Sequence, residues 1–267
     1  MKKNRLAKVI ALGVAAVMTI GLAGCGNSGG SDSGSKDKGI TVISREEGSG
    51  TRDAFTELTG VLQDDVDKTV DTAEISNSTS VVLQSVADNP NAIGYVSLGS
   101  LDDSVKSVKV DGVEASVDTV KSGDYKLQRP FNIVTKGKLK ELPQDFVNYI
   151  MSKEGQQIIE KEGYISEAKD AKSYKASGLK GTVTLAGSTS VAPVMEVLAD
   201  NYKKLNSGVD IEIQQTGSGA GIQSTIEGVC DIGMASRALD DSEAKEGLDS
   251  QQIALDGIAV IVNNDNS

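Results

Sequence analysis

Histidine and tryptophan are missing from the 267-residue chain, which also holds only two cysteines, Cys25 and Cys230. Histidine is the commonest general base in enzymes and the commonest metal ligand, so its absence excludes serine–histidine and cysteine–histidine hydrolase mechanisms. A metal site would need carboxylate ligands alone, and the sequence contains no EF-hand spacing and no Walker A pattern. We therefore expect no metal and no other cofactor.

Basic residues are also few. The chain has 27 Lys and Arg against 38 Asp and Glu, which gives a net charge of −11. A chain this acidic is a poor binder of nucleic acid, and it offers no polybasic surface to a membrane. An anionic ligand would have to be held by local geometry, because the overall field repels it.

The first 24 residues have the pattern of a signal peptide, in which basic residues precede an apolar run at 9–22. That run is shorter than the roughly 20 apolar residues that a membrane-spanning helix needs. It ends in Leu-Ala-Gly-Cys, which resembles a bacterial lipobox, so we expect Cys25 to carry a lipid such as palmitate. The alternative is an ordinary signal peptide with an incidental cysteine. Residues 25–39, rich in glycine, serine and charge, are predicted to form a flexible tether, and a lipidated Cys25 would leave Cys230 without a disulfide partner.

From residue 40 onward, short β-branched runs alternate with helical patterns. The patterns predict strands at 40–43, 93–96, 105–110, 182–185, 209–214, 231–234 and 258–262, and helices at 51–62, 78–87, 143–162, 193–205 and 221–227. The polar stretch 166–180 breaks the alternation and is predicted to be a linker. Alternating strands and helices favour an α/β fold with mixed sheets, in one large domain or two lobes.

Three loops rich in glycine and hydroxyl residues lie between a predicted strand and a predicted helix, at 44–51, 186–190 and 217–221. A helix N-terminus presents unpaired N–H groups and the positive end of the helix dipole, so each loop could bind an anion. Arg45 adds a planar guanidinium that can hold an oxyanion through two parallel hydrogen bonds. Taken alone, the composition of each loop could equally reflect ordinary helix caps and turns, in which glycine, serine and threonine are common. The three together, with Arg45, favour a site for a tetrahedral oxyanion.

Several segments resemble the phosphate-binding proteins of phosphate ABC transporters. ISREEGSGTRDAF (43–55), NPNAIGYVSLGSL (89–101), RPFNIVTKG (129–137) and SKEGQQIIEKEGY (152–164) are similar to the C-terminal half of that family. GTVTLAGSTSVAPVME (181–196), QTGSGAG (215–221), DIGMASRAL (231–239) and IALDGIAVIVN (253–263) are similar to its N-terminal half. Because the halves stand in reversed order, the chain reads as a circular permutation in which residues 166–180 join the family's usual termini.

The resemblance implies a two-lobed, type II periplasmic-binding-protein-like α/β fold that closes on its ligand. We expect one lobe at 40–103 and the other at 104–262, with the hinge near residues 103 and 263. The family has a helix-and-turn segment, usually with a tryptophan, after the motif at 253–263. This sequence ends at Ser267, so the first lobe is expected to need residues after 263 for its completion.

The resemblance also implies which residues bind phosphate. The expected phosphate-binding residues are Arg45, Ser49, Gly50, Thr51, Thr189, Ser190, Ser218 and Arg237, and the expected supporting residues are Glu47, Ser188, Gly217, Gly219 and Ser236. Glu47 is expected to orient Arg45. Arg237 is a departure, because some members have an aspartate there that accepts a proton from phosphate, while others also have Ser-Arg. The departure weakens the expected choice of phosphate over sulfate.

We therefore expect an extracytoplasmic lipoprotein, anchored to the cell membrane by its lipid, that captures inorganic phosphate and delivers it to the membrane-embedded permease of an ABC importer. It is expected not to be an enzyme. Three alternatives remain open at this point. They are a receptor for another tetrahedral oxyanion such as sulfate or molybdate, a surface lipoprotein without a transport role, and a phosphate-ester hydrolase with Ser49 or Thr51 as nucleophile.

Overall fold

The computed structural model describes residues 39–168 and 170–266. The predictions for the signal peptide, for Cys25 and for most of the tether lie outside the described residues.

One half of the described chain is built around a parallel pair of strands, β1 (Thr41–Arg45) and β5 (Ala92–Ser97), with β4 (Glu74–Ser76) on the outer side of β1. The other elements of this half are α1 (Gly50–Leu58), β2 (Leu62–Gln63), β3 (Val66–Asp67), α2 (Thr79–Ala87), the 3-10 turn η1 (Leu98–Ser100), β6 (Val105–Ser107) and α3 (Val117–Ser122). We call this half the first lobe.

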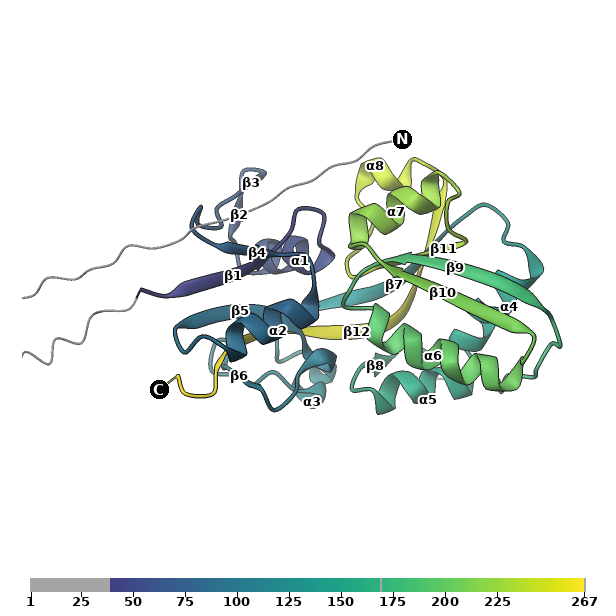
Figure 1. Cartoon of the computed structure of the whole chain (residues 1–267), viewed down its shortest axis with the longest axis horizontal. Helices are drawn as coiled ribbons and strands as arrows, with labels where there is room; N and C mark the ends of the chain where they lie inside the picture. The colour runs from purple at the N-terminus through teal and green to yellow at the C-terminus, as the bar shows by residue number, and fades with distance from the viewer. Residues whose placement is uncertain (1–38, 169, 267) are drawn as a thin grey trace, which may run out of the picture. The chain divides into compact units, whose positions relative to one another are not determined.

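The second lobe contains a parallel set of strands in the order β10 (Val209–Gln215), β9 (Gly181–Gly187), β11 (Ile232–Ala235), followed by the antiparallel β7 (Gln128–Lys136). Its remaining elements are α4 (Glu141–Ile150), α5 (Lys153–Lys161), β8 (Ile165–Ser166), α6 (Ala192–Leu205), α7 (Ser218–Ile226) and α8 (Asp241–Ala244). The last strand, β12 (Leu248–Asn263), joins the two lobes: it pairs with β7 up to Gly257 and with β5 from Ile258. Figure 1 shows β12 and β7 running from one lobe into the other.

Each lobe has its own hydrophobic core. The first contains Ile43, Val82 and Ile258, and the second contains Phe131, Phe146 and Leu198, all at most 2% exposed. Separate cores mean that each lobe can remain folded while the two move against each other.

The boundary between the lobes differs from the prediction. Val105, Val120 and Leu127 are buried in the first core, so the predicted boundary after Asp103 is wrong. The chain enters the second lobe only at β7, because the apolar side chains of 105–127 pack on the first lobe. Sequence spacing does not reveal which core a short apolar segment will join.

Two other segments also differ from the prediction. The helix predicted at 143–162 is divided into α4 and α5, because Ser152 accepts a hydrogen bond from Gly155 N (3.2 Å) and starts a new helix. The linker has no helix or strand at 170–180, but it is anchored rather than loose. Tyr174 donates to the Asp145 carboxylate (2.5 Å), and its ring lies 5.1 Å from that of Tyr149.

Candidate anion-binding site

Segments from both lobes meet where strands end and helices begin. The first lobe contributes the turn between β1 and α1 and the N-terminus of α2. The second contributes the turn after β9, the N-terminus of α7 and the residue that follows β11. In open α/β sheets, ligands bind outside the carboxyl ends of the strands, and helix N-termini there supply free N–H groups and positive potential.

Buried hydroxyl groups from the two lobes hydrogen-bond to one another at this meeting point. Thr51 bonds Ser190 (2.9 Å between the oxygens). Thr79 bonds Thr189 (3.0 Å) and Ser190 (3.2 Å). Within the second lobe, the Ser236 hydroxyl bonds those of Ser188 (3.0 Å) and Ser218 (3.3 Å). We call these residues the hydroxyl cluster: Thr51, Thr79, Ser188, Thr189, Ser190, Ser218 and Ser236, all buried.

The guanidinium of Arg45 adjoins this cluster and is only 2% exposed. It donates to Thr79 Oγ1 (3.3 Å) in its own lobe and to Thr189 Oγ1 (3.0 Å) in the other lobe. Its Nε and Nη2 atoms both donate to the carboxylate of Glu46, each at 2.9 Å. The buried positive charge is therefore held in a fixed orientation by a bidentate pair.

The partner of Arg45 is Glu46 and not Glu47, so the predicted role of Glu47 is corrected. Glu46 N donates to Ser76 O (3.1 Å), which keeps this residue alongside β4, where its carboxylate can turn back to Arg45. Glu47 follows in the turn before Gly48, whose φ is +78°, and its side chain is exposed.

Glycines allow the two lobes to come close at the site. A Cβ on Gly50 would lie 2.6 Å from Ser218 Oγ and 2.8 Å from Ser236 Oγ, so a larger residue there would force its neighbours to shift. Gly219 N donates to Gly48 O (2.9 Å) across the lobes. Gly217 has a φ of +87° at the start of α7, which favours glycine. Ser49 caps α1 by accepting from Arg52 N (3.4 Å).

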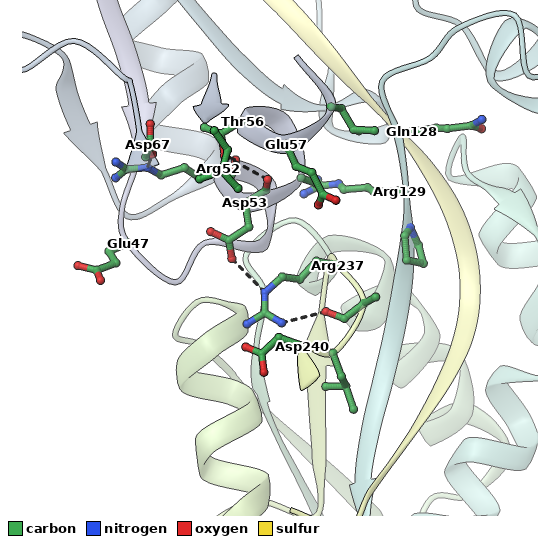
Figure 2. A pocket seen from close by; sticks show the side chains of 16 residues that line it. Glu47, Arg52, Asp53, Thr56, Glu57, Asp67, Gln128, Arg129, Arg237 and Asp240 are labelled. Carbon is green, nitrogen blue, oxygen red and sulfur yellow. Dashed lines mark hydrogen bonds and ion pairs between the residues drawn. The ribbon is translucent and has the colours of Figure 1, made fainter. Parts of the chain in front are cut away.

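Arg237 is a predicted phosphate-binding residue that the structure places outside the hydroxyl cluster. Its guanidinium donates to Asp53 (3.0 Å) and to both carboxylate oxygens of Glu243 (2.7 and 2.8 Å). Two carboxylates compete more strongly for a guanidinium than hydroxyl groups do, and they raise the pKa of Arg237. Arg237 lines a cavity of about 750 Å³ together with residues of both lobes, and Figure 2 shows its side chain beside that of Asp53.

Two features of this region were not predicted from the sequence. Thr79 belongs to the hydroxyl cluster, and the signal was the hydroxyl-rich Ser76-Asn77-Ser78-Thr79 before a predicted helix. The second feature is an ion pair between Arg129 and Asp256 (3.2 Å), both of them buried, and Asp256 also accepts from Ser97 (2.9 Å). Burial raises the pKa of Asp256 to about 6 against the opposing effect of Arg129. The signal that could have indicated this ion pair was the presence of one charged residue in each of two largely buried strands, Arg129 in β7 and Asp256 in β12.

The arrangement offers hydrogen-bond donors of several kinds to one small ligand. A guanidinium, hydroxyls and helix N-termini suit an oxyanion. Among the residues with described positions, neither Ser49 nor Thr51 forms a hydrogen bond to a carboxylate or an amine that could act as a general base and activate its hydroxyl group. No group of three or more Cys, Asp or Glu within 39–168 and 170–266 could hold a metal ion. In the same ranges no helix has the length and apolar character needed to cross a membrane.

Comparison with known proteins agrees with this geometry. A family model described as the PBP superfamily domain matches residues 27–154 and 172–267. Phosphate-binding protein PstS 2 of Streptococcus agalactiae serotype V is 53% identical over 274 residues, which cover 100% of this chain and 91% of that protein. Phosphate-binding protein PstS 2 of Streptococcus pneumoniae serotype 4 is 49% identical over 270 residues, again 100% of this chain and 91% of that protein.

The chain belongs to the family of these phosphate-binding proteins, within the PBP superfamily. The crystal structure of a phosphate-binding protein of a phosphate ABC transporter from Streptococcus pneumoniae TIGR4 matches with a TM-score of 0.68 and 52% identity, over 85% of this chain and 90% of that chain. The predicted family and the two-lobed α/β binding-protein fold are thereby confirmed. One continuous alignment covers the whole chain in the Streptococcus agalactiae relative, so the order of the halves is shared with it. The circular permutation relative to other members stays a prediction.

Proposed function

We propose that the chain is the phosphate receptor of an ABC importer, which binds inorganic phosphate between its lobes and delivers it to a membrane-embedded permease. The observation that carries the proposal is that the buried guanidinium of Arg45 donates hydrogen bonds to hydroxyl groups of both lobes. The relatives described above, which share about half of the sequence, are named phosphate-binding proteins.

Phosphate matches the chemistry of the cluster. It has oxygens in four directions, and the donors come from opposite sides: Arg45 and Thr79 in the first lobe, Thr189 and Ser218 in the second. A hydroxyl can also accept the proton that phosphate carries near neutral pH, because it is donor and acceptor at once. Hydrogen bonds to charged groups are worth about 1.5–3 kcal/mol each.

Binding is expected to be coupled to closure of the lobes. Arg45 reaches Thr189 (3.0 Å) and Gly219 reaches Gly48 (2.9 Å) only while the lobes are together. An anion that contacts both lobes therefore stabilises the closed form, by about 2.7 kcal/mol at a hundredfold excess over its Kd.

The proposal includes a transport role without catalysis. Hydrolysis of a phosphate ester would need an activated nucleophile, and the chain contains no histidine to activate Ser49 or Thr51. Delivery to a permease also requires that the receptor stays near the membrane. We propose that a lipid on Cys25 anchors it to the extracytoplasmic face, which the Leu-Ala-Gly-Cys motif at 22–25 supports.

Calorimetric titration with phosphate, sulfate and molybdate tests this function. Phosphate should bind to one site per chain and displace the other two anions, and the protein should not release phosphate from a generic phosphomonoester. Tighter binding of sulfate or molybdate would identify a receptor for another oxyanion. Absence of binding by all three would refute the receptor function.

A further inference from the structure

Arg237 links the two lobes next to the hydroxyl cluster without belonging to it. The residue follows Ser236, which is a member of the cluster, and its Nε atom donates to Asp53 Oδ2 on α1 of the first lobe (3.0 Å). Figure 2 shows this ion pair at the wall of the cavity between the lobes. Because α1 begins at Gly50, the same helix carries one end of the ion pair and part of the anion site.

Within its own lobe, Arg237 is held independently of Asp53. Both Nη atoms donate to Glu243 of α8 (2.7 and 2.8 Å). Glu243 is fixed in turn, because its carboxylate accepts from Asp240 N (2.9 Å) in the capping box of α8. When the lobes separate, the bonds to Glu243 can persist and the bond to Asp53 must break. Arg237 therefore stays pre-oriented toward the position that Asp53 occupies in the closed form.

We propose that Arg237 is a positioning residue that latches the closed form, through its ion pair with Asp53, and so slows the release of phosphate. The inference rests on the proposed phosphate-receptor function. The pair is partly shielded from water, since the side chains of Arg237 and Asp53 are 16% and 40% exposed. A pair of this kind has a modest effect that is screened by salt.

The latch makes a different prediction from direct phosphate binding by Arg237. If Arg237 bound the anion, loss of Asp53 would leave phosphate affinity unchanged or raise it, because the guanidinium would be freed. If Arg237 acts as a latch, Asp53→Asn and Arg237→Gln weaken binding to the same extent, and the double variant is no weaker than either one.

The experiment uses the whole protein, inorganic phosphate, equilibrium titration and stopped-flow release at low and at 1 M salt. Asp53→Asn and Arg237→Gln should each weaken phosphate binding about two- to fivefold at low salt, through faster release rather than slower association. The effect should shrink at 1 M salt. The matched control is Asp67→Asn, which breaks an ion pair with Arg52 (2.7 Å) inside the first lobe and should leave release unchanged.

Unchanged release in both variants would overturn the latch, and so would a loss confined to Arg237→Gln. A wild-type protein that binds no phosphate would instead refute the proposed function. In that case the latch would be tested by measuring the radius of gyration of the wild type and the variants by solution scattering, at low salt and without an anion. Asp53→Asn and Arg237→Gln, but not Asp67→Asn, should enlarge the radius of gyration, and equal radii would refute the latch.

Discussion

Replacement of Gly50 by alanine should separate phosphate binding from folding. The added Cβ would lie 2.6 Å from Ser218 Oγ and 2.8 Å from Ser236 Oγ, both in the opposite lobe. Real Cβ atoms do not come this close to other heavy atoms, so the lobes could close fully only if both serine side chains moved. Those serines hold each other (3.3 Å), and Ser218 Oγ also accepts from Ser236 N (3.1 Å), so neither moves without loss of a hydrogen bond.

The expected magnitude follows from the cost of overpacking. An extra methyl group in a well-packed site costs about 1–3 kcal/mol, which corresponds to roughly a five- to 150-fold weaker affinity for phosphate. The cost falls on the closed form alone, because each lobe has its own core. Alanine is also a better helix former than glycine, so the melting temperature without phosphate should be unchanged or slightly raised.

Calorimetric titration and thermal unfolding with and without phosphate measure the two effects. The control is Gly39→Ala, where an added Cβ meets no heavy atom within 4 Å, and its affinity should equal that of the wild type. Wild-type affinity in Gly50→Ala would show that the approach of the lobes at this point is not needed for binding. A large fall in the melting temperature without phosphate would show that Gly50 supports the fold instead.

Three further outcomes are expected. Arg45→Ala should weaken phosphate binding at least tenfold by calorimetry, whereas Lys203→Ala, which removes a surface charge paired with Asp200 (3.3 Å), should not. Burial raises the pKa of Asp256 to about 6, so protonation favours the folded state, and stability present below about pH 4 is lost as the pH rises through 6. Relative to Asp256→Asn, the unfolding free energy of the wild type should therefore fall as the pH rises over this range. If denaturant titrations gave the same pH dependence of the unfolding free energy for both proteins, this expectation would be contradicted. Cys25→Ser should release the protein from the membrane fraction or block its processing, and a processed variant that stays in that fraction would refute lipidation.

Features that depend on local chemistry were predictable from the sequence. The turn between β1 and α1 and the loops that precede α6 and α7 were predicted to bind an anion because glycine, hydroxyl residues and a following helix stand together in the chain. Their common position at the carboxyl ends of strands follows from the α/β alternation. The residues that these loops supply to the hydroxyl cluster, such as Thr189 and Ser218, were therefore among those predicted.

Features that depend on partners distant in sequence were not predictable in this way. Glu46 and Glu47 are adjacent and chemically alike, and the one that pairs with Arg45 is Glu46, whose N–H is bonded to Ser76 O on a distant strand. Arg237 was assigned to the anion by the resemblance, because it stands where some members of the family have an aspartate that contacts phosphate. Asp53, which binds its guanidinium, lies 184 residues away in the sequence.

The hinge also shows why the lobe boundary could not be found from spacing alone. The chain passes between the lobes at β7 and β12, where Arg129 and Asp256 are register partners on neighbouring strands. Asp256 accepts from Ser97 of the first lobe (2.9 Å), and Arg129 donates to Ser236 O of the second (3.4 Å). A buried ion pair contributes little net stability, but breaking it leaves an uncompensated charge. These contacts favour one register of the two strands, so we expect the proposed closure of the lobes to occur by twisting of β7 and β12 and not by sliding of one along the other.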